Sequence, residues 1–136
     1  MGLLMKTLPE RRQHGPRDEE LLWNVIQTVT RVDGVVEPGE AAMADLLSRS
    51  VPQLRAGRAD GRPIHTRKGL LDELQKLDDP ALARQLFVIA VETALASGDV
   101  NESEDQYVDH LRRVLRVDEA FAQRVIEVIG LKYGRG

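Results

Sequence analysis

The chain has 136 residues, of which 42% are hydrophobic and 30% charged, and its formal net charge is −3 at pH 7. This size predicts one domain with a core of its own, built mainly from aliphatic side chains because aromatic residues make up only 4%. The absence of cysteine excludes disulfides, zinc sites with thiolate ligands and cysteine nucleophiles.

Charge is unevenly distributed along the sequence. Residues 1–17 carry four basic residues and one acidic residue, and residues 51–69 carry five basic residues and one acidic residue. Acidic residues outnumber basic ones everywhere else. The basic stretch at 51–69 contains no aromatic residue and no nucleic-acid-binding motif, so we expect no nucleic-acid partner. No apolar run is long enough to span a bilayer and the first residues do not resemble a secretory signal, which predicts a cytoplasmic protein without direct membrane insertion.

The first part of the chain predicts a tail followed by two helices. Residues 1–16 contain Pro9, Gly15 and Pro16 and are expected to form an extended or mobile tail, with the helical domain at residues 17–136. Apolar residues then recur at helical spacing from Asp18 to about residue 33. Pro38 begins a second helix, which runs to about residue 50, and a long loop rich in glycine and proline follows at residues 51–65.

The centre of the fold is predicted at residues 79–98. Thr66 caps a short helix before it, and Asp79 with Pro80 then begins the next helix. Apolar residues cover every direction around the axis of this helix, which is typical of a helix enclosed by neighbours on several sides. Glu92 lies inside this apolar run, where a carboxylate is unexpected, and Gly98 ends the helix.

Two further helices complete the predicted fold. Asn101 caps the first of them, and Asp118 caps the last, whose inward face is predicted to include Phe121, Val125 and Val128 together with Ile129. The sequence thus predicts an all-α fold, a compact single-domain bundle of about six or seven helices, with two similar helix–turn–helix corners around a buried central helix.

The two corners, at residues 33–40 and 97–104, repeat one pattern. In each, an apolar helix ends at a glycine, a valine follows two positions later, and a glutamate follows six positions after the glycine. Both glutamates fall on the apolar side of the helix that begins there, where a solvated carboxylate is not expected. If the corners come together, five carboxylates converge near the middle of the molecule: Asp33, Glu40, Glu92, Asp99 and Glu104.

Two interpretations of these glutamates remain open. Glu104 is three residues after Asn101, the spacing of a capping box, and such a role requires no ligand. Alternatively, clustered carboxylates repel one another, and raised pKa values, arginine partners or a divalent cation must compensate. Calcium, zinc and manganese are the candidate cations.

The doubled corner, TRVDGVVEPGE at residues 30–40 and ALASGDVNESE at residues 94–104, resembles the tellurite-resistance protein TerB family. The N-terminal domain of a membrane-anchored DnaJ-type co-chaperone is a relative of that family. The resemblance covers roughly residues 18–130 and implies a helical bundle with a metal-binding acidic surface and a role in tellurite and other chemical stress. Ser97 departs from the pattern, because the first corner has Asp33 at that place and the second carries its acid at Asp99.

We therefore expect a non-enzymatic TerB-like module that binds a divalent cation or a protein partner, which could itself be membrane-associated, through its acidic cluster. The alternative is a pure interaction domain without a metal site. A carboxylate-dependent enzyme is disfavoured, because no nucleophile and base accompany the acids. His110 is the histidine best placed to join the acids, since it shares a predicted helix with Glu104, and Trp23 is expected to pack in the core.

Overall fold

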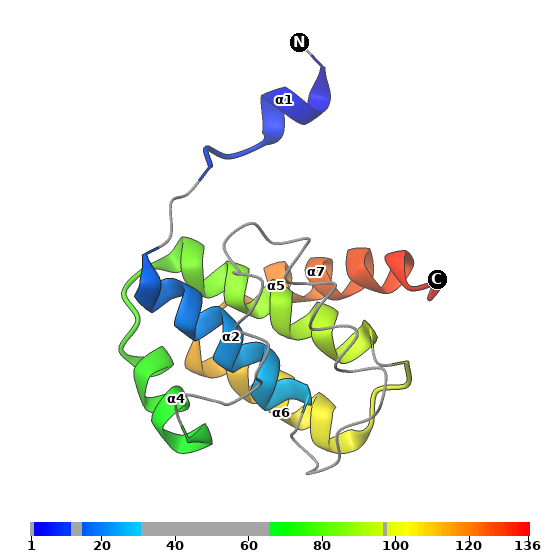
Figure 1. The fold of residues 1–136 in the computed structure, drawn as a ribbon. Coiled ribbons are helices and arrows are strands. Elements are labelled where there is room, and N and C mark those ends of the chain that lie inside the picture. Colours follow the sequence, from blue (N-terminus) through cyan, green and yellow to red (C-terminus); the bar gives the residue numbers. More distant parts are fainter. Residues whose placement is uncertain (1, 12–14, 31–65, 97) are drawn as a thin grey trace.

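A computed structural model describes residues 2–11, 15–30, 66–96 and 98–136 of the chain (Figure 1). These residues form six α-helices and no strand. The helices are α1 (Leu3–Thr7), α2 (Pro16–Thr30), α4 (Arg67–Gln75), α5 (Pro80–Ala96), α6 (Glu102–Val114) and α7 (Glu119–Lys132). The predicted all-α fold is confirmed, whereas the predicted helix at residues 38–50 lies outside the described residues. Among the described helices, none combines the length and the apolar character needed to cross a bilayer.

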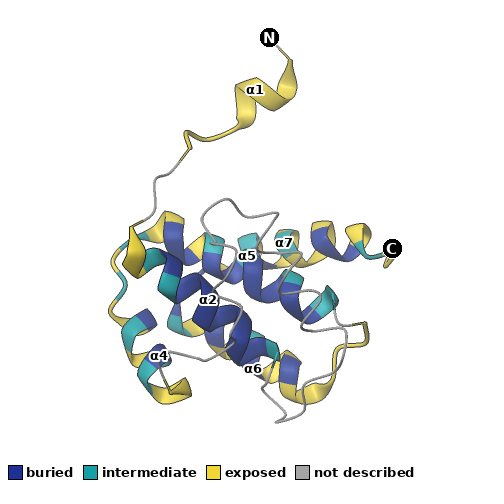
Figure 2. Ribbon diagram, viewed as in Figure 1, coloured by how far each residue is buried: buried dark blue, intermediate teal, exposed yellow. Residues whose placement is uncertain are grey.

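The predicted central helix is α5, which packs against α2, α6 and α7 (Figure 1). Figure 2 shows buried residues on α5 and on the α2 helix beside it. Because its apolar residues point in every direction, α5 can bury side chains against several neighbours at once. Its buried residues are Leu82, Ala83, Leu86, Phe87, Ile89, Ala90, Val91, Thr93 and Ala94.

Side-chain caps fix where three of the helices begin. Thr66, Asp79 and Asp118 each accept the backbone N–H of the residue three positions later, at 3.1, 3.1 and 3.3 Å. Each bond satisfies one of the backbone donors that the first helical turn leaves without a partner. All three caps were predicted from the sequence and are confirmed.

A left-handed residue ends α6. The backbone N–H of Val117 donates to the carbonyl of Arg112 at 3.0 Å, and that of Arg116 donates to the carbonyl of Arg113 at 3.1 Å. These two bonds form a Schellman motif, which needs positive φ at the residue just past the helix and usually has glycine there. Here the residue is Arg116, with φ of 57°. An arginine therefore holds a conformation that costs a side-chain-bearing residue about 1 kcal/mol.

Three details of the sequence interpretation need correction. The tail contains a helix, α1, whose five residues are too few to show periodicity. Helix α2 begins at Pro16 rather than Asp18, because proline fits the first helical position. Val128 was predicted to face inward but is 65% exposed. The inward side of α7 instead carries Ala122 and Ile129, which are buried, and Val128 is rotated away from it.

We predict that Leu86→Ala lowers the free energy of unfolding by about 2–5 kcal/mol, because it leaves a cavity beneath a side chain that is fully buried in α5. The exposed Val128 provides the control, and Val128→Ala should change stability by no more than about 0.5 kcal/mol. Urea denaturation followed by circular dichroism measures both. Equal losses in the two variants would contradict the packing of α5 described above.

Candidate functional site

Glu92, the carboxylate on the central helix, is held by the end of α7. Its Oε1 accepts a hydrogen bond from the Tyr133 hydroxyl at 3.0 Å and forms an ion pair with the Lys132 ammonium. The Glu92 side chain is only 18% exposed, and these partners offset the cost of burying a carboxylate. Its place in an apolar helix thus has a structural explanation within the described residues.

The same contacts shift two pKa values upward. The hydrogen bond from Lys132 to Glu92 raises the pKa of the lysine, and burial followed by the hydrogen bond to Glu92 raises the pKa of Tyr133. In both groups the folded chain holds the proton more tightly than the unfolded chain does. Their contribution to stability is therefore present below about pH 10 and is lost as the pH rises through the folded pKa values.

Asp99 lies at the turn between α5 and α6. Gly98 makes this turn with φ of 108°, a left-handed conformation that glycine adopts without a steric penalty. Arg135 reaches the turn, donating to the Gly98 carbonyl at 3.0 Å and approaching the Asp99 carboxylate at 3.4 Å. Asp99 itself is fully exposed, so its ion pair with Arg135 is a weak surface contact.

Glu104 forms the capping box that its spacing predicted. Its backbone N–H donates to Asn101 Oδ1 at 2.8 Å, and the Asn101 N–H donates in return to Glu104 Oε1 at 3.5 Å. Glu104 is buried, which confirms that it lies on the inward side of α6. The capping interpretation therefore accounts for this glutamate without any ligand.

The predicted convergence of five carboxylates can be followed for only three of them. Asp33 and Glu40 lie outside the described residues. Within the described ranges, no three acidic or histidine side chains are close enough to hold a metal ion together. Glu92, Asp99 and Glu104 instead each have a partner on the protein. A cation held jointly with Asp33 and Glu40 stays a prediction.

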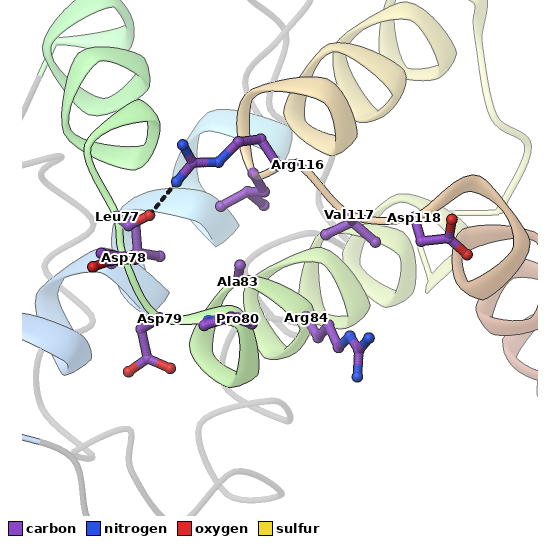
Figure 3. A pocket seen from close by; sticks show the side chains of 10 residues that line it. Leu77, Asp78, Asp79, Pro80, Ala83, Arg84, Arg116, Val117 and Asp118 are labelled. Carbon is purple, nitrogen blue, oxygen red and sulfur yellow. Dashed lines mark hydrogen bonds between the residues drawn. The ribbon is translucent and has the colours of Figure 1, made fainter.

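A small hollow of about 170 Å³ lies where the α4–α5 turn meets the α6–α7 turn (Figure 3). Its polar groups have roles in folding. Asp79 and Asp118 cap helices, and the Arg116 guanidinium donates to the Leu77 carbonyl across the hollow, as the dashed line in Figure 3 shows. Arg84 lies over the ring of Phe121, 5.0 Å from its centre. We therefore regard this hollow as a structural junction between the two turns.

A second depression in the described surface runs between α4 and α6, and we call it the α4–α6 groove. It consists of two adjoining hollows, of about 420 and 580 Å³, which share Leu71 and His110. Pockets of this size commonly accept ligands or side chains of a partner. The groove is lined by Arg67, Lys68, Leu71, Asp72, Gln75, Ser103, Gln106, Tyr107, His110, Arg113, Val114 and Arg116.

The α4–α6 groove combines apolar and basic side chains. Half-buried Leu71 and the buried Tyr107 contribute its apolar part, and the Arg67 guanidinium lies over the Tyr107 ring, 5.1 Å from its centre. Burial raises the pKa of Tyr107, opposed by Thr28 and Arg67, so its hydroxyl stays neutral. Four lining residues are arginine or lysine and only Asp72 is acidic, although Arg113 also pairs with Asp109 at 2.8 Å.

Sequence reasoning missed this groove and the residues that bind Glu92. The basic residues of the groove belong to two helices far apart in the sequence, so no local pattern unites them. Lys132 and Tyr133 form no motif, and the available signal was the carboxylate of Glu92 within an apolar helix, which requires a partner. Trp23 packs in the core as predicted. His110 lines the groove.

No protein-family model, curated protein or solved structure matches the chain. The resemblance of the two corners to the TerB family therefore stays a prediction.

We predict that Glu92→Gln reduces the dependence of stability on alkaline pH. In the wild type, the free energy of unfolding should fall above about pH 10, as Lys132 and Tyr133 lose the protons that Glu92 helps them retain. The variant should be less stable at pH 8 and should lose less stability on going to about pH 11. It should retain the pH dependence that arises from burial of Tyr107 and Tyr133. Urea denaturation across this range provides the measurement. A parallel pH dependence in both proteins would show that the contact does not stabilise the fold.

A second prediction concerns Glu104. Glu104→Gln should unfold close to the wild-type temperature, because glutamine also serves in a capping box, whereas Glu104→Ala should lose about 1 kcal/mol. Thermal melts with and without Ca²⁺, Zn²⁺ or Mn²⁺ measure this. If a metal stabilises the wild type and that shift disappears in Glu104→Gln, Glu104 is a metal ligand and capping is not its only role.

Proposed function

We propose that this chain is a non-enzymatic helical interaction module of the TerB-like kind, which docks a protein partner in the α4–α6 groove. The observation that carries the proposal is the combination in this groove of an apolar floor with mainly basic walls, on a chain whose net charge is negative. An interface of this type gives affinity through its apolar centre and selectivity through its charged rim.

The chemistry of the groove indicates the partner. Lys68 and Arg113 are exposed on its walls, and Leu71 provides an apolar surface between α4 and α6. A segment that carries acidic side chains beside one or two apolar ones complements this arrangement. Outside the groove and the two basic stretches at residues 1–17 and 51–69, acidic residues outnumber basic ones, so those parts of the chain repel the same segment.

A divalent cation is the second proposed ligand. Its support is the buried, inward-facing carboxylate of Glu104 at the repeated corner, together with the TerB-like pattern. The internal partners of Glu92, Asp99 and Glu104 favour the docking function over this one. The resemblance makes the response to tellurite and other chemical stress the proposed setting for either function.

The test is binding of a fluorescein-labelled peptide of alternating glutamate and leucine, measured by fluorescence anisotropy. Lys68→Glu and Arg113→Glu should each weaken binding about three- to tenfold, because each reverses a charge on the groove wall. Binding should also weaken as salt is added, since exposed charges are screened.

Two controls accompany this experiment. Arg124→Glu makes the same charge change on α7, outside the groove, and should leave the affinity unchanged. A peptide in which lysine replaces glutamate should not bind at the groove. Equal weakening by all three charge reversals would mean that the peptide senses net charge only, and the docking site would be refuted.

A further inference from the structure

Helix α1 exposes an apolar face that no other described element covers. Leu3, Leu4, Met5 and Leu8 are 80, 72, 70 and 60% exposed. Figure 2 shows every residue of α1 as exposed, and Figure 1 shows α1 standing away from the other helices. Four large apolar side chains in a stretch of six residues are unusual on a surface and mark a site of interaction.

The side chains of α1 are arranged amphipathically. Leu4 and Leu8 are one helical turn apart and lie on the same side, and the Leu8 N–H still donates to the Leu4 carbonyl at 2.9 Å. At about 100° per residue, Leu3 and Met5 flank these two leucines and Lys6 points to the opposite side. The segment thus has one apolar face and one cationic face.

The charge of this segment differs from that of the rest of the chain. Residues 1–12 carry three basic residues against one acidic residue, whereas the whole chain has a net charge of −3. Lys6, on the opposite side of α1 from the leucines, and Arg11, which follows the helix, are both exposed. An anionic surface therefore attracts residues 1–12 and repels the rest of the chain, whose net charge is negative.

A five-residue helix is too short to be stable in water by itself, so a contact that buries its apolar face also stabilises its helical form. One candidate occupant is a second copy of the chain, through the exposed Val128 and Leu131 of α7. Val128 lies one turn from Arg124 and Lys132, and Leu131 lies one turn from Glu127, so that surface is of mixed charge with more basic than acidic groups and does not complement Lys6 and Arg11. This charge arrangement disfavours the second copy.

We propose that α1 and the basic residues after it bind the surface of an anionic lipid bilayer. The leucines and Met5 enter the boundary between headgroups and acyl chains, and Lys6 and Arg11 contact the anionic headgroups. The attachment lies on the membrane and does not span it. With few apolar side chains inserted it is weak and reversible, and it depends on both the apolar and the cationic groups.

Co-sedimentation of the full chain with lipid vesicles tests this proposal. The wild type should bind vesicles that contain phosphatidylglycerol, and binding should fall as salt is added. It should not bind vesicles of phosphatidylcholine alone. Leu4→Glu and Leu8→Glu should each reduce the affinity about tenfold or more, because each removes a large apolar side chain from the interface and adds a repelled charge.

Val128→Glu is the matched control, since it replaces an equally exposed apolar residue on α7 with the same acidic one. Val128→Glu should bind the vesicles as the wild type does. Thermal melts should show all three variants folded, because each of the substituted side chains is exposed. No binding by the wild type, or unchanged binding in the α1 variants, would overturn the proposal. A lipid-free dimer that Leu4→Glu dissociates would overturn it as well, by assigning the face to a second copy.

Discussion

The arrangement of the fold depends on how a single carboxylate is accommodated on the central helix. Helix α5 is apolar in nearly every direction, so it can serve as the centre of the bundle, but Glu92 interrupts that surface. A largely buried carboxylate without a partner would be costly. Lys132 and Tyr133 supply the partner from the end of α7, so the ionic contact and the packing of α5 against α7 support each other.

The pairing of Glu92 with Lys132 and Tyr133 affects how the other acidic residues are interpreted. The sequence suggested that carboxylates gather at a shared site, where a cation would relieve their repulsion. In the described residues the three carboxylates do not gather, and each has its own partner: an ammonium and a hydroxyl at Glu92, a guanidinium near Asp99 and backbone donors at Glu104. The α4–α6 groove instead gathers four basic residues beside one acidic residue, and this excess of positive charge directs the proposed function toward an acidic partner.

The sequence predicted the features that are governed by local rules. The caps at Thr66, Asp79 and Asp118, the capping box of Asn101 and Glu104, and the burial of α5 all follow from a few neighbouring residues. Features that depend on distant pairs were not predictable. The α4–α6 groove, and the contact of Glu92 with Lys132 forty residues later, arise only when helices pack. Val128 was misplaced because the inward side of α7 is set by its contact with α5 rather than by its own apolar residues.

The position of Lys132 and Tyr133 in the sequence has a consequence for biosynthesis. The ribosome makes the chain from its first residue onward, so α2 and α5 emerge before the residues that neutralise Glu92. During that interval, a nascent intermediate exposes an unpaired carboxylate together with the apolar surface that α7 will cover. The core around Glu92 can therefore close only after α7 has been made, and until then the partly folded chain exposes apolar surface that favours aggregation.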